Sequence, residues 1–337
     1  MNLVPKRFHP HFLFLLGVLL LAAVFLSLFL GVSRLDFVGI FNGTAPSDRL
    51  VLLHERLPRA LLAMAVGTSL AAAGLAFQAV LNNPLADPYI VGVAGGAAVG
   101  GTFAMILPIS AIFGQLGVSA MAFLGGLAAI LMTWELSKDR LGQLRTYHVL
   151  LVGVVFNTFA SAVIMFLKSV VKAEKAQEML MWLMGTLSSD IRSPQAVGIS
   201  LGITFLALLI LYRLANGLNA LAIGQEDAAS LGVDPIRTTK GVFLAGSLLV
   251  ASAVSVAGMI GFVGLIVPHA IRAMVGSDHR ITIPASALLG ALFLLLADLA
   301  TRLMFPVFQT EAPVGVLTAL IGGPLFVYLL RRSEGLS

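Results

Sequence analysis

A few ionisable residues lie inside or beside long apolar segments, where each needs a partner or a function. Asp298 and Arg302 stand four residues apart, on one face of a helix, and His269 and Glu311 lie near the ends of apolar segments. A buried carboxylate can bind a transported proton, but a carboxylate four residues before an arginine favours a local ion pair. His269 has the chemistry of a metal ligand or a base. Because no second His, Cys or carboxylate cluster accompanies it, we interpret it as structural.

The chain carries no recognisable catalytic motif. It has no cysteine, which excludes disulfides and thiolate metal sites, and it contains neither G-x-S-x-G nor H-E-x-x-H. No G-x-x-x-x-G-K-[ST] loop is present to hold nucleotide phosphates. The net charge of +5 is spread over loops and does not form the basic stripe that nucleic-acid binding needs. We therefore predict no catalytic residue, no metal site, no cofactor bound by this chain and no nucleic-acid partner.

Long apolar segments must position these residues, and they determine the fold class. Hydrophobic residues make up 58% of the 337-residue chain and charged residues 11%, with a mean hydropathy of +0.99. Such values are typical of a protein whose main solvent is lipid. The uncharged run from Gly241 to Ile271 is too long for one span, and its glycines and Pro268 divide it in two. We predict ten membrane-spanning helices, with both chain ends on one side, near residues 12–32, 60–80, 89–107, 115–134, 147–167, 194–212, 241–257, 259–272, 281–300 and 313–330.

The polar connections indicate an orientation and one contact surface. With both ends inside, a small majority of the 21 Lys and Arg residues fall on inner segments, in the direction of the positive-inside rule. Other basic residues, including Arg56 and Arg59, form an outer excess that needs an explanation. The inner connection contains Gly224 to Gly232, which is typical of a short amphipathic helix ended by glycine. This helix either contacts another protein or lies on the membrane.

Glycine and proline patterns indicate close packing in one place and a helix break in another. Gly92, Gly96 and Gly100 follow at four-residue spacing, which lets helix backbones approach closely, and we interpret them as structural. The turn from Leu81 to Pro88 contains two prolines, which prevent a continuous helix. We predict a connector there, with a position beside a transport pathway as the alternative.

Taken together, the order and spacing of several motifs resemble the FecCD-type permeases of bacterial ABC importers for iron-siderophores, haem and cobalamin (vitamin B12). The resemblance covers nearly the whole chain, and although each motif alone is modest, their order is highly specific. The motifs are Arg56-Leu57-Pro58-Arg59, Gln78, Asn83-Pro84-Leu85-Ala86, Gly261-Phe262-Val263-Gly264-Leu265-Ile266-Val267-Pro268-His269, Gly276 with Asp278-His279-Arg280, and Glu311-Ala312-Pro313-Val314-Gly315.

The resemblance implies an all-α fold with about ten transmembrane helices, of the type II ABC importer permease architecture, in which residues 1–337 form a single permease domain. Such permeases work as homodimers, with a pathway at the subunit interface lined largely by the fifth and tenth helices. The implied partners are a cytoplasmic ATP-binding-cassette ATPase dimer, which binds the ATP, and a periplasmic or lipid-anchored substrate-binding protein. The implied location is the bacterial inner (cytoplasmic) membrane, with both termini cytoplasmic.

The resemblance also implies roles for individual residues. The arginines that would dock the substrate-binding protein are Arg56, Arg59 and Arg302. The cytoplasmic gate would be formed by Asn83, Leu85 and Thr146. The coupling helices at about 219–236 would contact the ATPase through Gly224, Glu226, Ala228, Leu231 and Gly232. The pathway would be lined by Val152, Phe156 and Asn157. The pathway positions carry no family-wide signature, so the substrate stays open.

Two other function classes are alternatives to an ATP-driven importer. An ion-coupled secondary transporter would use Asp298 to bind the proton, and replacing Asp298 with Asn would then abolish uptake. An integral-membrane enzyme is disfavoured because no polar catalytic cluster is present. The ordered motifs, the inner connection and the missing nucleotide site favour the importer, which would borrow its ATPase from another chain.

Overall fold

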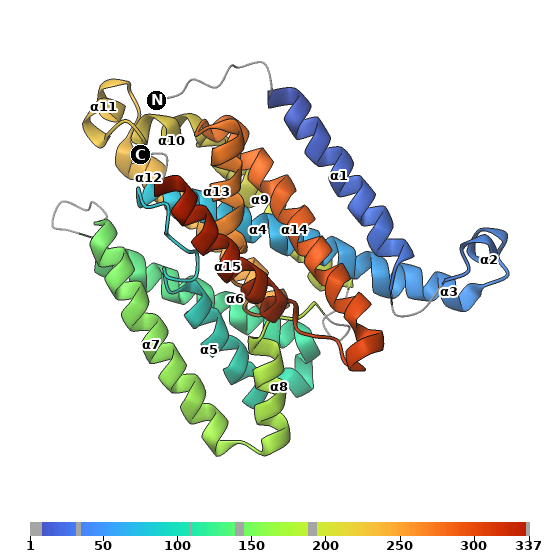
Figure 1. Cartoon of the computed structure of the whole chain (residues 1–337). Helices are drawn as coiled ribbons and strands as arrows, with labels where there is room; N and C mark the ends of the chain where they lie inside the picture. The colour runs from blue at the N-terminus through green and yellow to red at the C-terminus, as the bar shows by residue number, and fades with distance from the viewer. Residues whose placement is uncertain (1–8, 32–34, 108, 139–144, 188–193, 335–337) are drawn as a thin grey trace.

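The computed structural model describes residues 9–31, 35–107, 109–138, 145–187 and 194–334, which are built from helices (Figure 1). Among these residues, 7 helices are long and apolar enough to cross a membrane. Three shorter apolar helices, α5, α13 and α15, account for the remaining predicted spans. The ten helices are α1 (His9–Phe29), α4 (Leu57–Val80), α5 (Val93–Ile106), α6 (Ile109–Ser137), α7 (Thr146–Val170), α9 (Pro194–Arg213), α12 (Pro235–Ala257), α13 (Val263–Val275), α14 (His279–Phe308) and α15 (Val314–Glu334).

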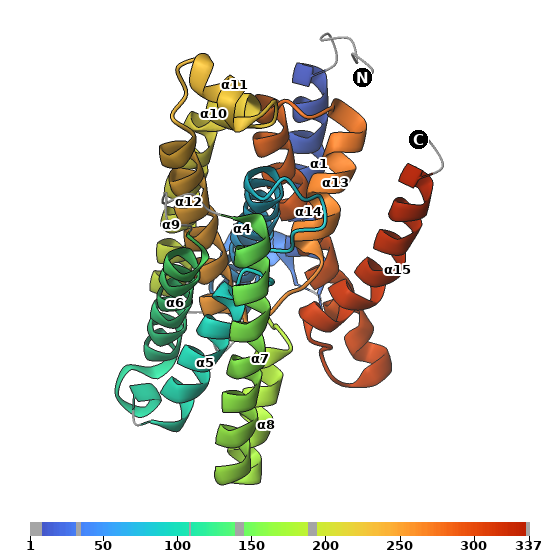
Figure 2. The same ribbon diagram turned by 90° about the vertical axis from the view of Figure 1, so that its left-hand side faces the viewer.

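Short helices occupy the connections between these spans. They are α2 (Phe37–Asn42), α3 (Pro46–Val51), a π-helical turn (Leu52–Arg56), α8 (Ala173–Leu183), α10 (Ala215–Leu221) and α11 (Gln225–Ser230). The sequence predicts α11 from its amphipathic composition and the glycine that ends it, and it gives no comparable signal for the others. The starting end of α1 and the finishing end of α15 lie at the same end of the bundle as α10 and α11, while α8 lies at the opposite end (Figure 2). This arrangement agrees with an even number of spans.

Helix α4 forms the centre of the bundle, packed against α9, α12, α13 and α14. Its sequence is rich in alanine and glycine, and nearly every residue from Ala60 to Gln78 is buried. A Cβ atom added to Gly67 would lie within 3.0 Å of the backbone oxygen of Gly290, and one added to Gly74 would meet that of Gly264 equally closely. Small residues therefore bring α4 into backbone contact with α14 and α13.

The predicted glycine stripe of α5 packs against α6. A Cβ atom added to Gly96 would meet the backbone oxygen of Gly125, and one added to Gly100 would meet that of Met121, both within 3.0 Å. Gly92 does not belong to the stripe, because it precedes the helix with φ of 93°. The structural interpretation of Gly96 and Gly100 is confirmed.

The long apolar run after α11 is divided between α12 and α13, as predicted. Gly258 ends α12 with φ of 69°, and Phe262 starts α13 with φ of 69°, a left-handed conformation that is uncommon for a residue with a side chain. The Tyr89 hydroxyl holds the intervening backbone, because it donates to the oxygen of Ile260 at 2.9 Å and accepts from its nitrogen at 2.8 Å. A side chain from the turn before α5 thus satisfies backbone groups that the helix break leaves free.

Candidate functional site

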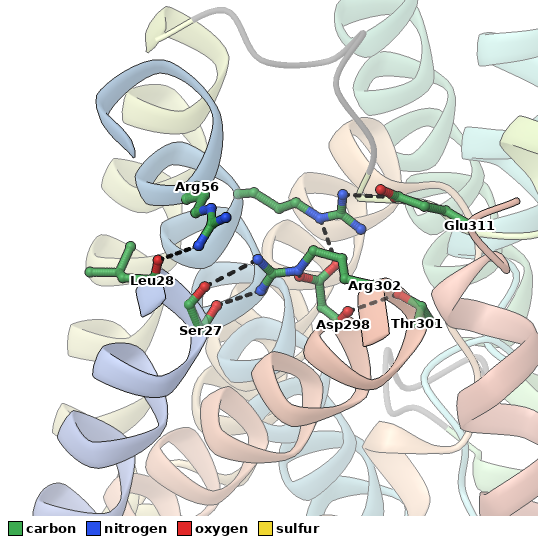
Figure 3. Close-up of polar contacts among 8 residues, drawn as sticks. Ser27, Leu28, Arg56, Asp298, Thr301, Arg302 and Glu311 are labelled. Atoms are coloured by element: carbon green, nitrogen blue, oxygen red, sulfur yellow. Dashed lines mark hydrogen bonds and ion pairs between the residues drawn. The ribbon is translucent and has the colours of Figure 1, made fainter. Parts of the chain in front are cut away.

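Four charged residues meet where α4, α14 and the connection before α15 come together, and we call them the outer charge cluster: Arg59, Asp298, Arg302 and Glu311 (Figure 3). Arg59 Nε lies 2.8 Å from Asp298 Oδ1, and Arg59 Nη1 lies 2.8 Å from Glu311 Oε2. Arg302 Nε lies 3.1 Å from Asp298 Oδ2. Two guanidinium groups and two carboxylates balance one another, which makes burial of the Asp298 carboxylate tolerable.

The predicted ion pair of Asp298 with Arg302 is confirmed, but the sequence did not indicate its third member. Arg59 is 239 positions from Asp298 in the chain and comes to it from the first turn of α4. A signal was available, since a carboxylate inside an apolar span needs compensation and Arg59 begins another apolar span at the same end. Asp298 is therefore the shared partner of two arginines. The secondary-transporter alternative instead requires a carboxylate that is free to bind a proton.

Two arginines at this end also bind the last turn of α1. Arg56 Nη1 donates to the backbone oxygens of Leu28 and Phe29 at 2.7 and 3.0 Å. Arg302 Nη1 donates to the backbone oxygen of Ser27 at 3.1 Å and Nη2 to its hydroxyl at 2.5 Å. Carbonyls in the last turn of a helix have no partner within the helix, and cations near this end also interact favourably with the helix dipole. Arg56 and Arg302 therefore fix the end of α1.

The structure brings the three predicted docking arginines to one end of the bundle, but it does not leave them free at the surface. The exposed fractions are 5% for Arg56, 6% for Arg59 and 4% for Arg302. Each guanidinium already has partners within the subunit. The three arginines are thus buried in the isolated subunit, and their role in docking stays a prediction.

At the opposite end of α4 from Arg59, the predicted gate residues lie around the turn between α4 and α5. Asn83 Oδ1 accepts a hydrogen bond from the backbone nitrogen of Leu85 at 2.9 Å, and the Thr146 hydroxyl, at the start of α7, donates to the oxygen of Leu81 at 3.2 Å. The Leu85 side chain is exposed. The structure thus places all three predicted gate residues at one turn.

Asp87 lies in the same turn and was not predicted as a site residue. It is buried, and its Oδ1 accepts from the backbone nitrogen of Tyr89 at 2.7 Å. Burial raises the pKa of the Asp87 carboxyl to about 6. The hydrogen bond opposes this shift, but desolvation of the charged form is the larger effect.

The predicted coupling segment folds as α10 and α11, at the end of the bundle where α1 begins (Figure 2). Gly232 follows α11 with φ of 81°, as the predicted glycine end requires, and Gly224 precedes the helix with φ of 145°. Ala228 is fully buried, Glu226 is exposed, and the side chain of Leu231 is 66% exposed. Ile223 and Ile236 are exposed in the same connection, so Leu231 belongs to an apolar surface suited to a protein partner.

A cavity of about 250 Å³ lies beside α7, and of the three predicted pathway residues one lines it. Asn157 lines it together with Tyr89 and Met259, and the Asn157 amide donates to the oxygen of Tyr89 at 2.8 Å. Phe156 instead lies near Gly92, and Val152 is half-buried outside the cavity lining.

Two polar contacts between distant helices also escaped sequence reasoning. The Gln78 amide donates to the oxygen of Gly264 at 3.1 Å and accepts a hydrogen bond from the guanidinium of Arg272. Asn219 of α10 binds the residues that begin α14. Within the described parts of the chain, no three His, Asp or Glu residues are grouped so that they could hold a metal ion.

Known proteins resemble this chain in sequence and in fold. The sequence model of the FecCD transport family matches residues 19–332. The cobalamin import system permease protein BtuC of Halobacterium salinarum is 43% identical over 87% of this chain and 76% of its own length. The hemin transport system permease protein HmuU of Yersinia pestis is 36% identical, with 95% and 96% covered. A solved structure of a metal-chelate type ABC transporter in an inward-facing conformation has 32% identity and a TM-score of 0.81, covering 96% of this chain and 99% of that one.

Proposed function

Because the chain belongs to the FecCD transport family and is therefore the permease subunit of an ABC importer, we propose that two copies form a homodimer that imports a metal chelate. The observation that carries this proposal is the match over nearly the whole chain. Exposed apolar side chains on α7 and α15, the fifth and tenth spans, support a subunit interface there: Leu151, Val155 and Phe159 on α7, and Leu320, Ile321 and Tyr328 on α15. The cavity containing Asn157 opens beside α7 and supports a pathway at this interface.

The inner end of the subunit would receive a separate ATP-binding-cassette ATPase. Residues 219–236 form a folded connection with an exposed leucine, and the chain has no phosphate-binding loop of its own. In this proposal Gly224 and Gly232 shape the coupling helix, Ala228 anchors it, and Glu226 and Leu231 meet the ATPase. Both termini would be cytoplasmic, because the start of α1 and the end of α15 lie at the α10–α11 end (Figure 2).

Copurification tests this proposal directly. Coexpression with the ATPase encoded beside this gene should yield a complex of two permeases and two ATPases, whose ATP hydrolysis responds to the substrate-binding protein. Replacing Leu231 with Ala should weaken the complex, because it removes exposed apolar surface from the contact. Replacing Ile112, which is 68% exposed at the other end of the bundle, with Ala is the matched control and should leave the complex unchanged. Wild-type permease that never retains an ATPase would refute the proposal.

The cargo we propose is a bulky metal chelate, namely an iron-siderophore, haem or cobalamin. The similar permeases named above belong to cobalamin and hemin import systems, which supports this class. Asn83, Leu85 and Thr146 would close the pathway at its inner end, and Val152, Phe156 and Asn157 would line it. Uptake of each chelate into proteoliposomes, with the others as competitors, identifies the cargo, and no uptake of any of the three would contradict the class.

Docking of the substrate-binding protein is proposed to use Arg56, Arg59 and Arg302 at the outer end. Arg56 provides the cleanest test, because it binds backbone oxygens and does not neutralise Asp298. Replacing Arg56 with Gln should weaken binding of the partner at low salt and reduce the salt dependence of its affinity. The control is Arg49→Gln, because Arg49 is exposed on α3. Unchanged affinity of the Arg56→Gln complex at low salt would remove Arg56 from the docking surface.

A further inference from the structure

One polar joint connects α10, beside the coupling helix, with the inner end of α14. The Asn219 amide nitrogen donates to Asp278 Oδ1 at 2.8 Å, and Asn219 Oδ1 accepts from the backbone nitrogen of His279 at 2.9 Å. His279 Nδ1 also lies 2.7 Å from Asn219 Oδ1, and its imidazole is buried. One side chain of α10 thereby satisfies three groups at the start of α14, and we call these residues, Asn219, Asp278 and His279, the inner joint.

Further contacts at the start of α14 hold the Asp278 carboxylate in place. Asp278 is the residue that caps α14, and its carboxylate accepts from the backbone nitrogen of Arg280 at 3.0 Å. The Arg280 guanidinium also binds it, at 2.7 Å, and holds the pKa of the Asp278 carboxyl below its usual range. Asp278 is therefore ionised at neutral pH and always available to accept the hydrogen bond of Asn219.

Helix α14 has polar joints at both of its ends. Its inner end binds α10 through Asn219, and its outer portion carries Asp298 and Arg302, which bind α4 and α1. About 19 residues of α14 separate His279 from Asp298, which is about 30 Å along the helix at 1.5 Å per residue. A displacement of α10 and α11 can therefore reach the outer charge cluster through a single helix.

We propose that Asn219 is a positioning residue that couples the ATPase to transport by fixing the coupling helix to α14. The inference rests on the proposed function, since it assumes that an ATPase contacts α11. Helix α10 is well suited to this task because Ala215, Leu218 and Ala220 bury its other faces in the bundle. Breaking the inner joint lets α11 move with the ATPase without carrying α14.

The test uses complexes of permease and ATPase in proteoliposomes and measures substrate transported per ATP hydrolysed. For Asn219→Ala, we expect this ratio to fall by about fivefold or more, while ATP hydrolysis continues. A merely structural role would lower the yield of complex but would not change the ratio. Asn216→Ala is the matched control, because Asn216 is exposed on the same helix.

An isosteric variant provides a second test. Asn219→Asp opposes two carboxylates and should uncouple at least as strongly as Asn219→Ala. The variant keeps the size of the side chain and the oxygen that accepts from the backbone nitrogen of His279, so it removes the bond to Asp278 alone. Asn219→Asp therefore decides the matter if Asn219→Ala fails to assemble.

The outcomes separate this inference from the proposed function. Wild-type permease that does not bind an ATPase would refute the function itself. With wild-type coupling established, three results would overturn the inference alone: an unchanged ratio in Asn219→Ala, an equal loss in Asn216→Ala, or an unchanged ratio in Asn219→Asp.

Discussion

Replacing Asp298 with Ala is expected to destabilise the permease by about 3–5 kcal/mol, because it leaves two buried guanidinium groups without their carboxylate. The Asp298 side chain is 0% exposed, and it is the shared partner of Arg59 and Arg302. Both arginines are buried, and Arg302 also holds the last turn of α1. Thermal and denaturant unfolding of the detergent-purified protein, followed by fluorescence of Trp134 and Trp182, measures the change.

Glu311→Ala provides the matched control within the same cluster. The Glu311 side chain is 32% exposed, so water can replace it at Arg59, and we expect a loss of about 1 kcal/mol or less. Arg59 keeps its contact with Asp298 in this variant. Equal losses from Asp298→Ala and Glu311→Ala would show that burial does not determine the strength of these ion pairs and would contradict our account of the cluster.

Replacing Gly74 with Ala should also have a large effect, with a loss of about 3 kcal/mol or more expected from overpacking. The added methyl group would lie within 3.0 Å of three backbone atoms of Gly264, including its oxygen. Backbone atoms of α13 cannot turn aside as a flexible side chain would. Helices α4 and α13 must therefore separate, which also strains the hydrogen bond from Gln78 to Gly264. Unfolding measurements in detergent report the loss.

Gly202→Ala is the control, since a Cβ atom added there meets nothing within 4 Å. Gly202 lies inside α9, where alanine is a better helix former than glycine by about 1 kcal/mol. This variant should be as stable as the wild type or slightly more stable. If Gly74→Ala were also neutral, the backbone contact between α4 and α13 would not limit packing in this bundle.

The two largest expected effects concern the same helix. Helix α4 contributes Arg59 to the outer charge cluster and Gly74 to the contact with α13. Its outer end is thus held by charge and its inner half by close backbone packing. Both contacts orient α14 and α13, which the inner joint and the Arg272–Gln78 hydrogen bond also tie to the inner end. We therefore expect α4 to be the least tolerant helix of the bundle.

The amino-acid sequence by itself determined the features that depend on nearby residues. Hydropathy over about 20 residues predicts each span. The glycines and Pro268 predict that the apolar run after α11 divides in two, and in the structure Gly258 ends α12 with a positive φ. The four-residue spacing of Asp298 and Arg302 is enough to predict their contact on one helix. An amphipathic pattern ended by glycine likewise predicts α11. All of these are properties of a single segment, because helical geometry relates residues a few positions apart.

Only the tertiary structure decided which segments meet. Nothing local to Arg59 indicates Asp298 as its partner, and nothing local to Asn219 indicates Asp278 and His279. The three arginines expected at an outer surface are buried because α1, α4 and α14 converge on them. Charged groups in a low-dielectric bundle must find partners, but helix packing determines which partners are within reach. Asp298, Arg302 and Glu311, which the sequence shows as separate charges in or beside apolar segments, connect α1, α4 and α14 with the segment before α15 in the folded subunit.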